Sequence, residues 1–175
     1  MRSMRRPVRV ALASLTWLFL VAPAPAGDAS RSQVRVTGGI TIRLAGGWHV
    51  IRQRISEVVE PIPRLAAATF PVHLRTHSCA CGMPNIRGFP GPGAFILVWE
   101  YPDLQLSQLT RFPRRPSSFT VSQGNPHWDE CAGPSWTTAF RTAARGFQVE
   151  VYLGPHAPPQ VRRQVEAILA SFQAA

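Results

Sequence analysis

The sequence predicts an α+β domain, in which a mainly antiparallel sheet is followed by one helix that packs on it. Three observations predict this class. Short alternations of apolar and polar residues recur along the chain, Phe95–Tyr101 is an almost unbroken apolar run, and one amphipathic helical pattern comes last. A chain of 175 residues with 45% hydrophobic composition is long enough for one domain and too short for two ordinary ones.

Residues 1–26 are predicted to be a secretory signal peptide. Four arginines precede the mostly apolar stretch Val10–Ala22, and Ala24–Ala26 supplies small residues for cleavage. Residues 27–32 are then expected to be a flexible tail, and residues 33–175 form the single domain. The protein is therefore expected to be secreted or extracytoplasmic, in the cell envelope, with no transmembrane span after cleavage.

The first elements of the domain are expected to form a β-hairpin. Gln33–Thr37 and Ile40–Leu44 alternate apolar and polar residues, which is typical of strands with one buried face. Gly38 and Gly39 separate them and favour a tight turn, because glycine adopts positive φ at little cost.

The middle of the chain alternates strand and loop signals. Glu57–Arg64 carries two prolines and is predicted to be a loop, whereas Ala66–Leu74 is predicted to be a strand. Thr76–Pro92 is rich in Gly, Pro and Cys, which indicates an ordered loop. Phe95–Tyr101 follows as a central strand that is buried on both faces.

The last strands are predicted around a second hairpin. Pro102–Ser118 is expected to be irregular and Phe119–Ser122 a short strand. Trp136–Thr142 and Phe147–Leu153 then form the hairpin, with the bend at Arg145-Gly146.

The predicted helix runs from Pro159 to Phe172. Prolines at its start do little harm, because the first amides of a helix have no intrahelical acceptor. Its apolar residues fall on one stripe, which predicts that the helix packs across the sheet. The stripe consists of Val161, Val165, Ile168, Leu169 and Phe172.

The chain is basic, with a formal net charge of +10 and no lysine. Removing the leader takes away four arginines and no acid, which leaves +6. Arg111, Arg114 and Arg115 form the densest group; a solvated loop is one interpretation, and a contact to an acidic partner or lipid is the other. Trp128 is a further candidate for a partner contact. Nucleic-acid binding is disfavoured because no basic stripe interleaved with aromatic residues is present.

Three cysteines are expected to meet an oxidising environment. Cys79 and Cys81 are too close for an unstrained mutual bridge, so a long-range disulfide to Cys131 is favoured. If Cys79 is the partner, the chain-entropy model gives about 4 kcal/mol of stabilisation. One cysteine then remains over.

A metal site is the alternative interpretation of the same loop. His77, Cys79, Cys81 and Met83 occupy every second position. Thiolate and thioether sulfurs favour Cu(I), and imidazole can complete the set. If the segment is extended, these side chains point the same way. Copper is the cofactor under this alternative, and no cofactor is expected otherwise.

Signals for catalysis are weak. His127–Glu130 places an imidazole near two carboxylates, but a solvated loop is the favoured interpretation. The chain has no Gly-x-Ser-x-Gly, His-Glu-x-x-His or P-loop motif. Glu100 lies within the apolar strand and is the one acid expected to be partly buried, paired with an arginine. An enzyme is therefore not predicted.

Several short motifs are distributed along the chain from about residue 40 to 173. They are Gly47-Trp48-His49, Phe70-Pro71-Val72, Cys79-Ala80, Cys131, Gly146-Phe147, Gly154-Pro155, Ala157-Pro158, Arg162-Arg163-Gln164 and Ile168-Leu169-Ala170-Ser171. With these motifs the chain resembles a family of short uncharacterised exported proteins of high-GC bacteria. The resemblance implies a disulfide between Cys79 and Cys131, with Cys81 a departure from the family pattern, and it implies no activity.

In architecture the pattern is also similar to PsbP/Mog1-like domains, since a Gly-Trp follows an early strand pair and a helix closes the chain. That similarity implies a domain that binds partners or assists assemblies. The expected function is a small exported, non-enzymatic binding or accessory domain, monomeric, with an unknown protein or cell-envelope partner. The alternative is an extracytoplasmic copper-type metal-binding protein.

Overall fold

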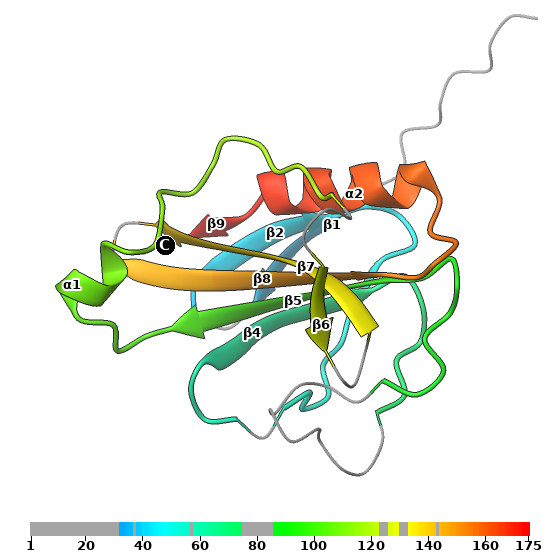
Figure 1. Cartoon of the computed structure of the whole chain (residues 1–175), viewed down its shortest axis with the longest axis horizontal. Coiled ribbons are helices and arrows are strands. Elements are labelled where there is room, and N and C mark those ends of the chain that lie inside the picture. The colour runs from blue at the N-terminus through cyan, green and yellow to red at the C-terminus, as the bar shows by residue number, and fades with distance from the viewer. Residues whose placement is uncertain are drawn as a thin grey trace, which may run out of the picture.

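The computed structural model describes residues 32–36, 38–56, 58–74, 86–122, 126–129, 133–142 and 144–175. Strands dominate this part of the chain, and helix α2 is the longer of its two helices (Figure 1). The elements are β1 (Ser32–Val36), β2 (Ile40–Leu44), β3 (His49–Val50), β4 (Ile62–Ala68), β5 (Ala94–Tyr101), α1 (Leu106–Leu109), β6 (Pro126–Asp129), β7 (Gly133–Thr142), β8 (Arg145–Leu153), α2 (Pro159–Ala170) and β9 (Gln173–Ala174).

The strands form two antiparallel sheets. The small sheet has the order β1-β2-β9, and the large sheet has the order β3-β4-β5-β8-β7-β6. Every strand pair in both sheets is antiparallel. Together with α2, this arrangement confirms the predicted α+β class.

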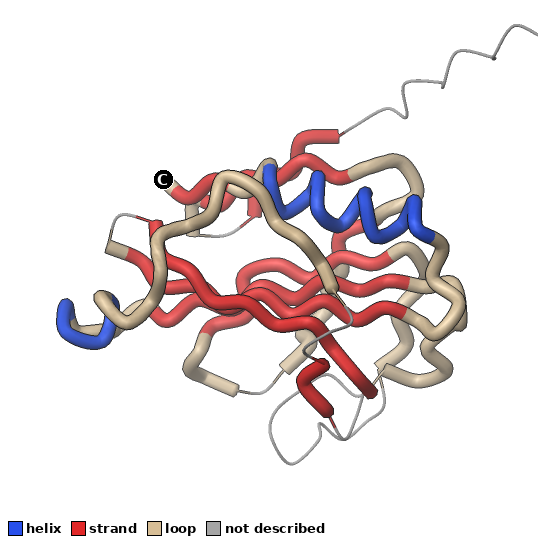
Figure 2. Tube along the Cα trace, turned by 45° about the horizontal axis from the view of Figure 1, so that its top comes forward, coloured by secondary structure: helices blue, strands red, loops and turns tan. Residues whose placement is uncertain are grey.

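The large sheet is covered on both faces. One face packs against α2 and the small sheet, which lie together along one side of the large sheet in Figures 1 and 2. The other face packs against loop residues, among them Ile55, Phe70 and Ile86. The main core therefore lies between the two sheets and the helix.

Strand β5 forms the centre of the large sheet, as predicted. Its residues from Ala94 to Glu100 are all buried, and it pairs with β4 on one side and with β8 on the other. Ile96 and Val98 face the helix side, while Phe95, Leu97 and Trp99 face the loop side.

The predicted first hairpin is confirmed. Strands β1 and β2 pair around Gly38 and Gly39, whose φ angles are 81° and 72°. The second edge of β2 receives β9, so Ile40 lies opposite Ala174. The first and last described strands thus share one sheet.

Helix α2 confirms the predicted stripe. Val165, Ile168 and Leu169 are buried within the helix, and Phe172 is buried just beyond its end. The helix ends at Ala170, two residues earlier than predicted. It is tied to the segment before β3 by the indole of Trp48, which donates a hydrogen bond to the Gln164 side chain.

The predicted loop or short turn at Glu57–Arg64 and the predicted strand at Ala66–Leu74 were wrong in their bounds. The strand is β4, which begins at Ile62 and ends at Ala68. Pro63 lacks an amide donor, and the ladder shifts register between Pro63 and Leu65, so a bulge accommodates the proline. Beyond β4, the apolar residues up to Leu74 pack against the loop-covered face instead of continuing the ladder.

The predicted strand at Phe119–Ser122 is also absent from the described residues. Phe119 and Val121 are buried in the main core, so their alternation reflects packing without a strand partner. The amide of Val121 donates to the Glu166 carboxylate of α2. Within the segment Pro102–Ser118, α1 provides one short helical turn.

The second hairpin is formed by β7 and β8, and Arg145-Gly146 opens β8 directly after the bend. A Cβ at Gly146 would lie 2.7 Å from Cδ1 of Leu104, so that side chain would have to shift. His127–Asp129 belongs to strand β6 at the sheet edge, so the prediction of a loop there was wrong.

Candidate functional site

A cleft of about 430 Å³ lies in the described part of the chain. It lies where β1, the edge strand of the small sheet, faces β3 and β4 at the edge of the large sheet. We call it the sheet-edge cleft. Among the described residues, its lining contains three arginines, one glutamine and otherwise apolar side chains, with no acid: Val34, Val50, Ile51, Arg52, Gln53, Arg54, Ile55, Pro63, Arg64, Leu65 and Ala66.

The segment that carries Arg52 and Arg54 is fixed in place. The amide of Ile51 donates to the carbonyl of Ala66 over 2.9 Å. The Gln53 side chain donates to the carbonyl of Val72 over 3.1 Å, and Ile55 is buried against the loop-covered face. Both exposed arginines therefore project from an anchored wall.

The third arginine of the cleft is held by a buried carboxylate. Arg64 Nε lies 2.5 Å from Glu100 Oε2, and Arg145 Nε lies 2.6 Å from Glu100 Oε1. Glu100 is only 3% exposed, which confirms the prediction that it is buried and paired with arginine. Burial alone would raise the pKa of Glu100, but hydrogen bonds and charges from Arg145 and Arg64 outweigh it and lower that pKa.

We call the pairing of Glu100 with Arg64 and Arg145 the Glu100 brace, and it joins the two sheets. The Arg145 guanidinium also donates to the carbonyl of Ala175, whose amide donates to the carbonyl of Gly39. Gly38 lies close to the Glu100 brace, because a Cβ at this position would lie 3.1 Å from Cζ of Arg64. The turn of the first hairpin, the end of β9 and one wall of the cleft thus meet at Glu100.

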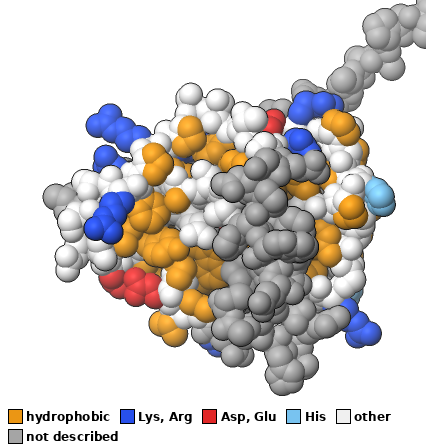
Figure 3. All heavy atoms as spheres, viewed as in Figure 1, with side chains coloured by type: hydrophobic (Ala, Val, Ile, Leu, Met, Phe, Trp, Pro, Cys, Tyr) orange, Lys and Arg blue, Asp and Glu red, His pale blue; other side chains and the backbone are white. Residues whose placement is uncertain are grey.

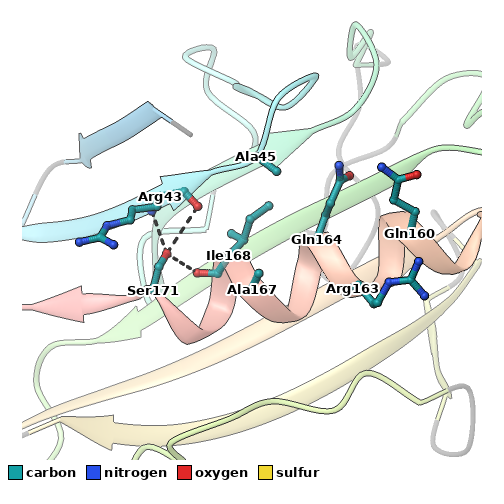
Figure 4. Close-up of a pocket in the computed structure, with 8 residues that line it drawn as sticks. All are labelled: Arg43, Ala45, Gln160, Arg163, Gln164, Ala167, Ile168 and Ser171. Carbon is teal, nitrogen blue, oxygen red and sulfur yellow. Dashed lines mark hydrogen bonds between the residues drawn. The ribbon is translucent and has the colours of Figure 1, made fainter. Parts of the chain in front are cut away.

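A second, smaller hollow of about 220 Å³ lies between β2 and α2, and we call it the helix groove. Arg43, Gln160, Arg163, Gln164 and Ser171 provide its polar lining. Figure 4 shows the guanidinium groups of Arg43 and Arg163 directed away from each other and away from its centre. The two cations of the helix groove therefore do not converge on one ligand position.

The remaining polar groups of the helix groove already serve the fold. The Ser171 hydroxyl accepts from the Arg43 amide over 2.8 Å and donates to the Ile168 carbonyl over 2.6 Å (Figure 4). Gln164 accepts the indole hydrogen bond of Trp48. These contacts hold α2 on β2.

The face of the large sheet that is covered by loops, on the side away from α2, contains a second buried acid. Glu150 is 3% exposed and accepts hydrogen bonds from Gln148 and Tyr152, each over 2.8 Å. Tyr101 donates to Gln148, and burial, followed by the charge of Glu150, raises the pKa of Tyr101. The prediction that Glu100 was the one buried acid was therefore incomplete.

The three arginines predicted as a partner contact separate in the structure. Arg111 and Arg114 are exposed, whereas Arg115 donates to the carbonyls of Leu169 and Ala170 at the end of α2. Its guanidinium also lies 5.5 Å from the Phe119 ring, and burial lowers the pKa of Arg115. Arg115 thus caps α2, where a cation is favoured by the helix dipole. On the face in Figure 3, basic side chains lie dispersed and form no patch.

Most of the predicted sulfur chemistry lies outside the described residues. This holds for His77, Cys79, Cys81, Met83 and Cys131, so both the disulfide and the copper site stay predictions. Trp128 belongs to β6, and only its backbone is described. In the described part of the chain, no three His, Cys, Asp or Glu side chains cluster as a metal site would require.

Sequence reasoning missed the sheet-edge cleft. Arg52 and Arg54 form a polar run with Gln53 between Ile51 and Ile55, and such a short polar run is ordinarily a solvated loop. Glu150 was missed because Gln148, Glu150 and Tyr152 form the polar side of a strand, which is ordinarily solvent-exposed.

No family model matches the chain, and neither curated proteins nor solved structures gave a match. Within the described residues, no helix is long and apolar enough to cross a membrane. The structure establishes the class of the fold, an α+β domain of two antiparallel sheets and a packed helix.

Proposed function

We propose that the chain is a small exported, non-enzymatic binding domain whose ligand occupies the sheet-edge cleft. The observation that carries the proposal is the composition of that cleft, which combines an apolar floor with arginines and has no acid among its described lining residues. Its volume of about 430 Å³ falls within the range of small-molecule sites, roughly 300–1,000 Å³.

The anchored walls of the cleft support binding. Hydrogen bonds from Ile51 and Gln53 fix the segment beside β4, and an ion pair with Glu100 holds the side chain of Arg64. A site that is ordered before the ligand arrives loses less conformational entropy on binding. Ordered walls of this kind are expected of a binding domain.

The chemistry of the lining favours binding over catalysis at this cleft. A guanidinium stays protonated at physiological pH and cannot serve as a general base. The remaining lining residues are one glutamine and apolar side chains, which neither attack a substrate nor transfer protons readily. Arginines in such a setting position an anion.

The test is a titration with the uncharged dye Nile red. Val50→Trp should fill the cleft and reduce dye affinity at least tenfold, because Val50 lines it. Val161→Trp is the matched control: Val161 is also partly buried against the main core but does not line the cleft. Equal affinity in both variants, or no saturable binding by the parent protein, would refute the proposal.

The alternative function is copper-type metal binding by His77, Cys79, Cys81 and Met83, favoured by their every-second-position pattern. Intact mass of the exported protein, with and without thiol alkylation, separates the two. One alkylatable thiol and no metal supports the disulfide of Cys79 and Cys131. Three alkylatable thiols and the mass increment of one copper, lost on denaturation, would establish the metal site.

A further inference from the structure

Resting on the proposed function, we infer that the sheet-edge cleft binds a single-chain amphiphile with an anionic headgroup. The hydrocarbon chain lies along the apolar floor, and the headgroup is held by Arg52 and Arg54. A medium-chain carboxylate such as dodecanoate is the simplest ligand of this class.

The floor of the cleft suits a hydrocarbon chain. Val34, Val50 and Leu65 line the hollow from β1, β3 and β4, and all three belong to the main-core side. Ile51 and Ile55 line it from the segment that follows β3, on the loop-covered side. Leu65 is 2% exposed, so the floor is continuous with the core. Methylene groups that lie against these apolar side chains are removed from water, which favours binding.

The charges of the cleft suit an anion. Arg52 and Arg54 are both exposed and stand two residues apart on the anchored wall. Arg54 donates through Nε to the carbonyl of Ser56, which orients its guanidinium. Within the part of the chain that the structure describes, no carboxylate lines the cleft, and Glu100 is already shared between Arg64 and Arg145. The guanidinium forks of Arg52 and Arg54 match the bidentate geometry of a carboxylate.

The volume of the cleft suits a single-chain ligand. About 430 Å³ lies within the range of roughly 300–1,000 Å³ that small-molecule sites span. Dodecanoate, with twelve carbons and two oxygens, is a ligand of small-molecule size.

The edge of β4 also resists strand addition. Pro63 has no amide donor, and the bulge between Pro63 and Leu65 interrupts the regular spacing that an added strand needs. Ligand recognition at this edge therefore depends on side chains rather than on a backbone ladder. This favours a small amphiphile over an extended peptide.

The experiment compares ligands with one chain length in displacing Nile red, below their micelle concentrations. Dodecanoate should bind 1:1 and at least tenfold more tightly than dodecyl maltoside, and dodecyltrimethylammonium should bind most weakly. Arg52→Gln/Arg54→Gln should bring dodecanoate down to the affinity of dodecyl maltoside. Arg111→Gln/Arg114→Gln, which alters two exposed arginines outside the cleft, should leave it unchanged.

Several outcomes would overturn the inference. Equal affinity for the anionic and uncharged ligands would remove the headgroup assignment while leaving the proposed binding function intact. Stronger displacement by an acidic hexapeptide, or binding to phosphatidylglycerol vesicles without binding of soluble dodecanoate, would assign the arginines to another partner. If Nile red binds in a Val50→Trp-sensitive manner but no ligand of the series displaces it, the inference fails and the proposed function stands. If dye binding itself does not respond to Val50→Trp, the proposed function fails.

Discussion

The sheet-edge cleft and the helix groove are both lined by arginines, with no acid among their described lining residues, yet they differ in what their other side chains do. In the helix groove, Gln164 and Ser171 already hold α2 in place. In the cleft, apolar side chains line an open hollow and Arg52 stands exposed on a fixed segment.

This comparison shows that arginines in the lining of a hollow do not by themselves identify a ligand-binding site. The helix groove lies where a helix meets a strand, so its polar groups serve that packing. The cleft lies where two sheets end, and neither sheet fills the space between their edge strands. Changes to single side chains test whether the cleft is a ligand site whose wall is held by Glu100, and whether the polar groups of the helix groove only hold α2 on β2.

The largest expected effect follows from removing the charge of the Glu100 brace. Glu100→Gln leaves Arg64 and Arg145 without their shared anion and should lower the free energy of unfolding by about 3 kcal/mol. Urea denaturation measures the loss. Glu166→Gln, which alters the acceptor of the Val121 amide beside α2, should cost only about 1 kcal/mol. A smaller loss for Glu100→Gln than for Glu166→Gln would contradict the brace.

The same brace predicts an acid-sensitive stability. Because the pKa of Glu100 is lowered in the folded state, its contribution is complete above the unfolded-state pKa, near 4.5, and is lost as pH falls through the lower folded value. Urea unfolding measured between neutral pH and about pH 3 should therefore show a steeper decline for the parent protein than for Glu100→Gln. Parallel pH profiles would rule out this contribution.

A glycine pair isolates the contact between the first hairpin and the brace. Gly38 and Gly47 have similar φ angles of 81° and 83°, but a Cβ at Gly38 would meet Arg64 whereas one at Gly47 meets nothing within 4 Å. Gly47→Ala should cost about 1 kcal/mol from backbone strain alone, and Gly38→Ala about 1 kcal/mol more. Thermal unfolding of the two variants side by side measures the difference. Equal costs would mean that Arg64 moves aside freely.

Replacing Ser171 tests the structural role of the helix groove. Ser171→Ala removes the acceptor of the Arg43 amide and should cost about 1–2 kcal/mol of stability. Dodecanoate affinity should not change, because Ser171 does not line the cleft. Calorimetric titration combined with thermal unfolding checks both values, and a loss of affinity at unchanged stability would reverse the assignment of the two hollows.

The smallest effect is expected at Arg163. It is exposed, and Figure 4 shows it directed away from the centre of the helix groove. Arg163→Gln should change stability by less than about 0.5 kcal/mol and leave dodecanoate affinity unaltered. Arg52→Gln, at an equally exposed position in the cleft, should match it in stability but lose affinity. Similar ligand affinities for these two variants would erase the distinction between the hollows.

The periodicity of apolar residues within short segments was sufficient to predict three elements of the fold. The Gly38-Gly39 hairpin, the buried strand β5 and the stripe of α2 each follow from periodicity within a few residues. Glu100 was also predictable, because an acid within an apolar strand needs a cationic partner. Its particular partners, Arg64 and Arg145, come from neighbouring strands and depend on register.

The cleft could not be predicted, because it exists only between elements distant in the chain. Val34 of β1 and Leu65 of β4 share its lining only after the two sheets have packed. Strand β4 was misplaced for a related reason. Its prolines argued against a strand, and only the bulge opposite β5 shows how the sheet tolerates Pro63.

The pairing of Ile40 in β2 with Ala174 in β9 sets an order of events during synthesis. The small sheet cannot be completed until residues 173–174 have been made, long after β2 has left the ribosome. Until then Ile40, Ile42 and Leu44, which are at most 2% exposed in the finished domain, lack their helix and sheet covering. During that interval the chain has no closed core, and the apolar side chains of β2 stay accessible to water.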